Sequence, residues 1–197
     1  MNTPKKSLLV SMADKYQMET AQFANTIKHT CMPKDSTDEQ FAAFLMVAKE
    51  HNLNPLTREI YAFPGKGGGI QSIVGVDGWA KIMNTHPQFN GLSFENDIDD
   101  KGNLISVKAI IYRKDREHPV EITEYMSECK GVTEPWKKWP ARMLRHKAMI
   151  QCCRIAFGFT NIVDPDEYER HQSADFIDVT PNDTVTELNE KIKASSN

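Results

Sequence analysis

The sequence has no apolar run near the roughly 18 residues that a membrane-spanning helix needs. It has no Cys-x2-Cys pair, because Cys152 and Cys153 are adjacent and Cys31 and Cys129 stand alone. It also lacks a G-x-x-x-x-G-K-[ST] phosphate loop and the apolar core of a signal peptide. These absences argue against a membrane protein, a thiolate metal site and a P-loop nucleotide hydrolase. They predict a soluble cytoplasmic protein with reduced, mostly buried cysteines.

The overall charge balance is unremarkable, at a net charge of -3 over 197 residues, but the charges are unevenly placed. Residues 137–154 carry six cations and no acid, whereas residues 164–197 carry nine acids and three cations. The length predicts one folded domain, which we place at residues 1–172, followed by a short, flexible acidic tail at residues 173–197. Apolar periodicity is lost after Pro165, which predicts weak order from there on.

The apolar spacing predicts an α+β fold in which hairpins and a small antiparallel sheet pack with several helices. Helices are expected over residues 20–30, after the capping boxes of Ser36–Gln40, and from a cap at Asp77. A long basic helix is expected over residues 135–159, broken or restarted near Pro140. Strands are expected at residues 59–63, 70–74, 92–96, 105–113 and 120–126, with a tight turn at residues 99–103.

Two short motifs leave alternatives open. The glycine-rich turn around Lys66 suits both a phosphate-touching hairpin tip and a plain mobile turn. Asp97, Asp99 and Asp100 would suit a metal-dependent nuclease, but acids are also favoured in turns for local hydrogen bonding, and the turn interpretation is preferred. No histidine-carboxylate or serine-histidine arrangement stands out, so the sequence gives no indication of an enzyme.

The segment from Trp136 to Lys147 interleaves cations with two indoles, Trp136 and Trp139, a combination that binds single strands by phosphate pairing and base stacking. The alternative is a solvated helix whose tryptophans are core anchors. Helical spacing places Arg142, Arg145 and His146 in one sector and Lys147, Gln151 and Arg154 in another. One sector would face DNA and the other a neighbouring subunit or an internal carboxylate, and the sequence leaves their assignment open.

Seven segments along roughly residues 15–172 carry a pattern that is specific in residue type and order: Leu53–Pro55, Glu59–Pro64, Val74–Trp79, Ile111–Arg116, Arg142–Cys152, Ala156–Phe159 and Asp166–Glu167. In the same order, they closely resemble segments of the Red-beta (Bet) and RecT type of phage single-strand annealing proteins. The resemblance implies a non-enzymatic protein that pairs single-stranded DNA with its complement in phage homologous recombination, without ATP. A passive single-strand-binding protein without annealing activity is the alternative.

The resemblance further implies an oligomeric ring or helical filament in the bacterial cytoplasm and no cofactor, with magnesium as at most a counter-ion of DNA. Its partners would be single-stranded DNA, the annealed duplex and further copies of the chain. The family's docking domain for a phage exonuclease and a host single-strand-binding protein has only a short acidic counterpart here, so these two partners are not carried over.

The family's DNA contacts map onto Lys66, Arg142, Lys147, Arg154 and the aromatic Trp136, and Arg58 stands where the family has a lysine. Ala141 replaces another family lysine, and the loop between Lys130 and Pro135 is shorter than in the family. With the neighbouring cations included, the predicted DNA-binding residues are Arg58, Lys66, Arg113, Lys114, Trp136, Lys137, Lys138, Arg142, Arg145, Lys147 and Arg154.

Overall fold

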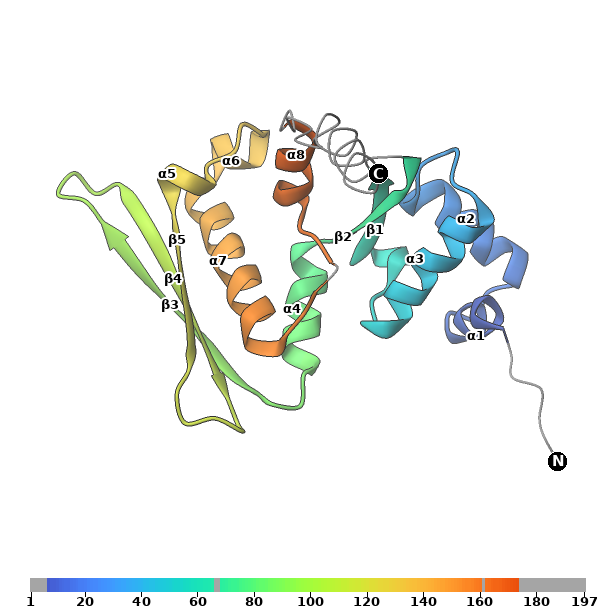
Figure 1. Cartoon of the computed structure of the whole chain (residues 1–197), viewed down its shortest axis with the longest axis horizontal. Helices are drawn as coiled ribbons and strands as arrows, with labels where there is room; N and C mark the ends of the chain where they lie inside the picture. Colours follow the sequence, from blue (N-terminus) through green and yellow to red (C-terminus); the bar gives the residue numbers. More distant parts are fainter. Residues whose placement is uncertain (1–6, 66–67, 161, 174–197) are drawn as a thin grey trace, which may run out of the picture.

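The computed structural model describes residues 7–65, 68–160 and 162–173 (Figure 1). The chain has the predicted α+β fold, with a two-stranded and a three-stranded antiparallel sheet and several helices. No helix in these residues is long and apolar enough to cross a membrane. The helices are α1 (Leu8–Lys15), α2 (Thr20–Cys31), α3 (Asp38–Glu50), the 3-10 turn η1 (Pro55–Thr57), α4 (Val76–Thr85), α5 (Met126–Cys129), α6 (Glu134–Lys138), α7 (Pro140–Phe157) and α8 (Pro165–Ser173). The strands are β1 (Ile60–Pro64), β2 (Ile70–Val74), β3 (Phe89–Ile98), β4 (Leu104–Arg113) and β5 (Val120–Tyr125).

The N-terminal lobe consists of α1, α2, α3, η1 and the β1–β2 hairpin (Figure 1). Helix α3 starts with the predicted capping box, in which Thr37 accepts from the backbone of Gln40 and the Gln40 side chain accepts in return. Phe23 of α2 and Phe44 of α3 are fully buried. The apolar faces of these helices therefore form the core of this lobe.

Helix α4 joins this lobe to the rest of the chain. It begins at Val76 with Gly75 as its N-cap, so the predicted cap at Asp77 is wrong by two positions, and Asp77 lies in the first turn instead. A Cβ atom on Gly78 would lie 2.3 Å from the carbonyl oxygen of Glu59. Only glycine therefore lets the helix approach the hairpin this closely.

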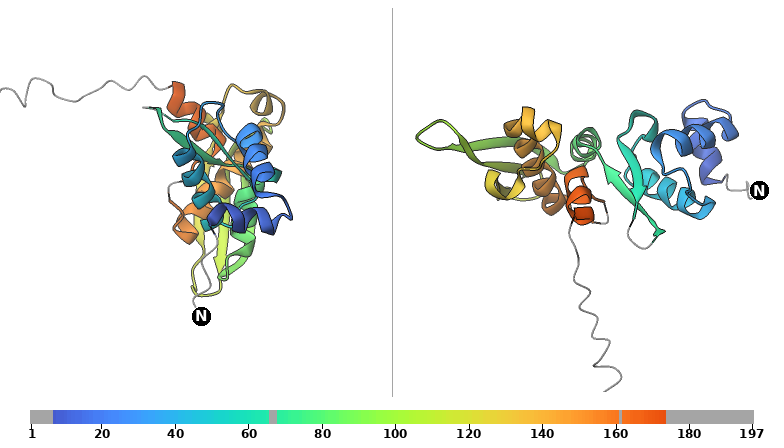
Figure 2. Two further views of the ribbon diagram at one scale, coloured as in Figure 1. Left: turned by 90° about the vertical axis from the view of Figure 1, so that its right-hand side faces the viewer. Right: turned by 90° about the horizontal axis from the view of Figure 1, so that it is seen from above.

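The C-terminal lobe is the β3–β4–β5 sheet with α7 laid across one face (Figure 2). The inward residues of β4 alternate with outward ones, and Val107, Ala109 and Ile111 are fully buried beneath the helix. The predicted turn between the first two strands is confirmed, since Asp99 accepts from the backbone of Lys101 and Asn103. The sheet therefore serves as the platform on which α7 is fixed.

The predicted long helix is two helices with a break at Pro140, as the proline position allowed. Trp139 is the C-cap of α6 and also the N-cap of α7. Helix α7 ends at Phe157, and its C-cap, Gly158, has a left-handed φ of 72° that closes the last turn.

The segment after α7 returns to the N-terminal lobe. Val163 forms a parallel bridge with Ile73 of β2, and the Tyr168 hydroxyl donates to the carbonyl of Pro64 at 2.9 Å. The expected weak order after Pro165 is wrong up to Ser173, because α8 forms there. The remainder of the predicted tail, residues 174–197, lies outside the described residues.

Candidate nucleic-acid interface

Four predicted cations lie together on the outside of α6 and the first turns of α7: Lys137, Lys138, Arg142 and Arg145. We call this set the α6–α7 basic surface. The side chains of Lys137 and Lys138 keep 62% and 61% of their surface exposed, although both approach Glu134, at 3.1 and 3.9 Å. Exposed pairs of this kind contribute little energy, so the two amino groups can exchange Glu134 for a phosphate.

The two arginines of this surface lie against aromatic rings. The Arg142 guanidinium lies 5.1 Å from the ring centre of Trp139, and that of Arg145 lies 5.7 Å from the ring of Phe94 on β3. Neither contact neutralises the charge, because a ring is not a counter-ion. Among the described residues neither guanidinium has a carboxylate partner, so the basic surface presents two positively charged groups held against rings.

The two indoles of the segment, Trp136 and Trp139, differ in their exposure to solvent. Trp136 is fully buried and its Nε1 donates to Oδ1 of Asp166 at 3.1 Å, whereas Trp139 keeps 50% of its surface exposed. A Cβ atom on Gly131 would lie 2.7 Å from the Trp136 ring, so the loop before α6 closes tightly over it. Trp136 is thus a core anchor in this structure, and no face of its ring is open to a DNA base.

The second sector of α7, which holds Lys147, Gln151 and Arg154, points inward. This settles which of the two sectors is internal. The Lys147 amino group lies 2.6 Å from Oδ2 of Asp164, and these side chains keep only 4% and 1% of their surface exposed. Asp164 also accepts from the backbone N–H groups of Asp166 and Glu167, which caps the start of α8. Of the alternatives left open for this sector, contact with an internal carboxylate is therefore the one that holds for Lys147.

Arg154 belongs to the same internal network. Its two terminal nitrogens donate to the two carboxylate oxygens of Glu167, both at 2.6 Å, and one donates to the carbonyl of Ile162 at 2.5 Å. The guanidinium also lies 5.3 Å from the ring centre of buried Trp79. Gln151 donates to Glu167 at 2.7 Å. Two cations thus meet two carboxylates, and this charge-balanced cluster holds α8 against α7.

Two pKa shifts follow from these surroundings. Burial raises the pKa of Glu167, but the hydrogen bonds from Arg154 and the charges of Lys147 and Arg154 outweigh it, so the pKa lies below its ordinary value. Burial lowers the pKa of His146, and the charges of Arg142 and Arg145 lower it further. His146 therefore resists protonation beside the basic surface.

The other predicted DNA-binding cations lie elsewhere. Arg113 is held by both oxygens of Asp115, at 2.8 and 2.7 Å, and by the carbonyl of Ala156 at the far end of α7. Lys114 beside it is exposed. Arg58, in a left-handed conformation with φ of 58°, lies over Tyr61 in the N-terminal lobe. Lys66 is outside the described residues. The predicted set is thus spread over separate places.

Comparison with known proteins gives the chain its family. A model of the RecT family matches residues 17–180. The chain belongs to the RecT family. It is 45% identical over 183 residues to the recombination protein Bet of Escherichia phage lambda, an alignment that covers 86% of this chain and 68% of the lambda protein. The resemblance noted in the sequence is therefore confirmed.

The acids of the β3–β4 turn and the four cysteines of this RecT-family chain do not form a metal site within the described residues. Asp99 holds the β3–β4 turn, while Asp97 and Asp100 are exposed. No group of three metal-binding side chains comes together within the described residues. All four cysteines are free and buried, and burial raises the pKa of Cys152 to about 11 and that of Cys153 to about 12. They pack as small apolar side chains.

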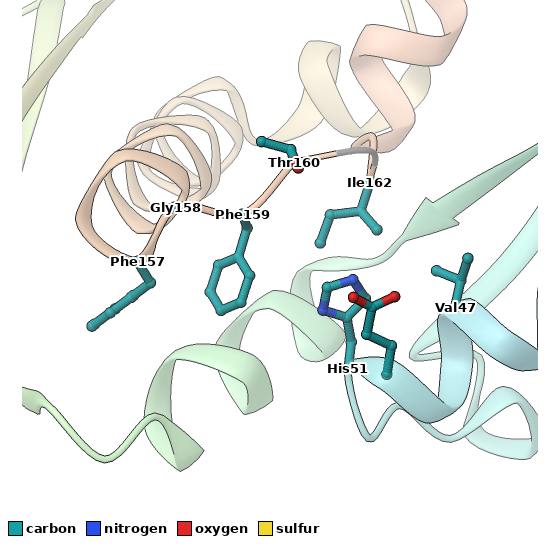
Figure 3. A pocket seen from close by; sticks show the side chains of 8 residues that line it. Val47, His51, Phe157, Gly158, Phe159, Thr160 and Ile162 are labelled. Atoms are coloured by element: carbon teal, nitrogen blue, oxygen red, sulfur yellow. The ribbon is translucent and has the colours of Figure 1, made fainter.

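A cavity of about 370 Å³ lies between the end of α3 and the loop that follows α7 (Figure 3). The His51 ring meets the Phe159 ring edge-on, with centres 5.8 Å apart, and Glu50 also lines the cavity. None of the described residues that line it is a lysine or an arginine. The cavity therefore offers aromatic walls and a carboxylate but no phosphate-binding charge.

The carboxylate partners of the inner sector are not among the predicted site residues, and neither is Trp139. Asp164, Asp166 and Glu167 give a usable signal, since they are the first acids after an acid-free cationic helix. Trp139 could have been separated from Trp136 by the proline that follows it, because a residue before proline is pushed out of helical geometry and leaves the helix face.

Proposed function

We propose that this protein binds single-stranded DNA through its backbone and pairs it with a complementary strand, without ATP, as the annealing step of phage recombination. The observation that carries the proposal is the exposed α6–α7 basic surface on a RecT-family chain 45% identical to the lambda recombination protein Bet. Phosphates are common to all sequences, so contacts of this kind fit a protein that must accept any strand.

The chemistry of annealing supports the assignment of the surface. An annealing protein must neutralise phosphates on strands that repel each other while leaving the base edges free to pair. Lysine amino groups and arginine guanidinium groups on the outside of a helix neutralise phosphates without contacting the base edges. Lys137, Lys138, Arg142 and Arg145 are the cations we assign to this role.

We assign Lys147 and Arg154 to the structure rather than to DNA. Lys147 is bonded to Asp164, just before α8, and Arg154 to Glu167 within α8, and the Lys147 side chain keeps only 4% of its surface exposed. A phosphate would have to displace Asp164 from a 2.6 Å ion pair to reach Lys147. Their role in DNA binding is then indirect: they hold α7, and with it the basic surface, in place.

One copy offers four cations at this surface, which is too few for stable pairing. At about 0.7 counter-ions released per phosphate, four contacts give a salt slope of about -3 and only modest affinity. We propose that many copies act along one strand, as a ring or helical filament, so that weak contacts add through effective concentration. No cofactor is required, and magnesium acts only as a counter-ion of DNA.

The binding part of the proposal is tested with labelled single strands of equal length and unrelated sequence. Fluorescence anisotropy should give similar affinities for mixed and homopolymer strands and a slope of about -3 per subunit between log affinity and log salt. A strong preference for one sequence, or an affinity insensitive to salt, would count against backbone recognition. A passive single-strand-binding protein would meet this test too, and annealing itself separates the two.

A further inference from the structure

We propose that the exposed indole of Trp139 is a stacking platform for a base of the bound strand, with Arg142 and the two α6 lysines holding the neighbouring phosphates. This inference rests on the proposed single-strand binding. It moves the aromatic contact from Trp136, where the sequence resemblance placed it, to a residue three positions further on.

Exposure separates the two candidates. Trp79 and Trp136 are fully buried, whereas Trp139 keeps half of its surface in contact with solvent. A large apolar ring left in water is available to cover another flat ring, and every base has such a face. Among the three tryptophans of the chain, all of which the structure describes, Trp139 is the one that can stack on a ligand.

The backbone that carries this indole is fixed by hydrogen bonds on both sides. The Trp139 N–H donates to the carbonyl of Pro135 at 2.8 Å, which closes α6, and its carbonyl accepts from Met143 at 3.0 Å, which opens α7. Pro140 restricts the backbone of Trp139 further. The ring therefore projects from a fixed joint between two helices, so less conformational entropy is lost when a base stacks on it than on a loop residue.

The charges around the ring match a nucleotide. The Arg142 guanidinium lies over the indole at 5.1 Å, and Lys137 and Lys138 directly precede it with more than half of their surface exposed. Glu134 is the acid that approaches both lysines, and it is itself 67% exposed. A flat ring bordered by cations fits a single strand, in which a base and its phosphates must be satisfied together. An apolar protein partner would offer these cations no counter-ion beyond Glu134.

The test compares two ligands of equal length and charge: oligo(dT), and an abasic strand that has the phosphates but no bases. Trp139→Ala should weaken oligo(dT) binding by roughly 5- to 150-fold, the equivalent of about 1–3 kcal/mol per stacked base, and leave abasic binding unchanged. Tyr112→Ala removes another exposed aromatic ring, 43% exposed on β4, and should change neither affinity. Circular dichroism checks that each variant is folded.

Intrinsic fluorescence gives an independent readout. Oligo(dT) should quench the emission of the wild-type chain and the abasic strand should not, because a stacked base quenches indole. Trp139→Phe keeps a ring but should remove the quenching, since the two remaining indoles are buried. Trp136→Phe, provided it folds, should leave the quenching in place.

Three outcomes would overturn the proposal while leaving single-strand binding intact. The first is an unchanged oligo(dT) affinity in Trp139→Ala, and the second is an equal loss of affinity for oligo(dT) and for the abasic strand in this variant. The third is a loss of self-association of Trp139→Ala without DNA, measured by sedimentation, which would make the indole a subunit contact. If the wild-type chain binds neither strand, the proposed function fails and this inference fails with it.

Discussion

The amino group of Lys147 lies 2.6 Å from Oδ2 of Asp164, at a point where both side chains are almost completely buried. These residues are 17 positions apart, and their contact joins the centre of α7 to the start of α8. A buried charge is costly without its partner, whereas the complete pair is close to neutral for stability. The pair therefore fixes where α8 lies on α7, and it takes Lys147 out of the exposed basic surface.

Breaking this pair from one side should destabilise the fold. Lys147→Met leaves Asp164 buried without its amino group and should lower the free energy of unfolding by about 3–5 kcal/mol. Adding Asp164→Asn, which keeps acceptors for the α8 cap, should recover part of that loss, so the double variant is more stable than the sum of the single variants predicts. Urea denaturation measures all three. At equal folded fraction, Lys147→Met should bind single strands as the wild type does, and a selective loss of binding would place Lys147 on DNA.

The contribution of the Glu167 charge to stability should be lost in acid. The pKa of Glu167 is lowered in the fold, so its contribution to stability is complete above the ordinary glutamate pKa of about 4.3 and is lost as the pH falls through the lower folded value. Glu167→Gln should therefore be less stable than the wild type at pH 7, with the difference shrinking below about pH 4. Urea midpoints at several pH values measure this. A constant difference would mean that the Glu167 charge is not responsible.

His146 adds a second acid effect at higher pH. Its lowered pKa means that the folded state resists a proton which the unfolded chain accepts below about pH 6.5, so stability falls as the pH drops from 7 towards 5. His86 has a lowered pKa too and contributes in the same direction. His146→Asn should flatten the decline in unfolding free energy over this range, and an unchanged slope would assign the decline to other groups.

The close approach of α4 to the hairpin makes another prediction. Gly78→Ala would push a methyl group to 2.3 Å from the carbonyl oxygen of Glu59, so the helix or the strand must shift, at a cost of about 1–3 kcal/mol. Gly75→Ala is the matched control, because there the methyl group meets its nearest atom at an ordinary 3.5 Å. Thermal unfolding should separate the two variants by several degrees. Equal melting temperatures would contradict the tight contact.

The α6–α7 basic surface predicts how single cations affect DNA binding. Lys137→Ala should weaken binding to every single strand by a similar factor and reduce the salt slope by about 0.7, the value for one phosphate. Lys49→Ala removes an exposed cation from α3, in the other lobe, and should leave both quantities unchanged. A sequence-dependent loss in Lys137→Ala, or an equal effect in the control, would argue against this surface.

Local patterns made much of the fold predictable from sequence. The capping box of Thr37 and Gln40, the hairpin and the turn at Asp99 each rest on bonds between residues close in sequence, which composition reveals directly. The sequence does not predict helix α8, because the helix has no apolar stripe. It is held by ion pairs and hydrogen bonds from α7, and these form only once the two segments meet.

The site was less predictable for the same physical reason. Lys137 and Lys147 look alike in a list of cations, but one is 62% exposed and the other 4%, and only the position of Asp164 separates them. Trp136 and Trp139 differ in the same way, since the helix break at Pro140 decides which indole enters the core. Residue type predicted the chemistry, and tertiary packing decides which residues can perform it.

Annealing is tested by the rate at which two complementary fluorescent oligonucleotides pair, with and without this protein, at moderate salt and with no nucleotide present. We expect the wild-type chain to speed pairing, and the variant in which Lys137, Lys138 and Arg142 are all replaced by alanine to pair the strands more slowly than the wild type. Tight binding of single strands with pairing slower than in the absence of protein would contradict annealing and make the chain a passive strand protector.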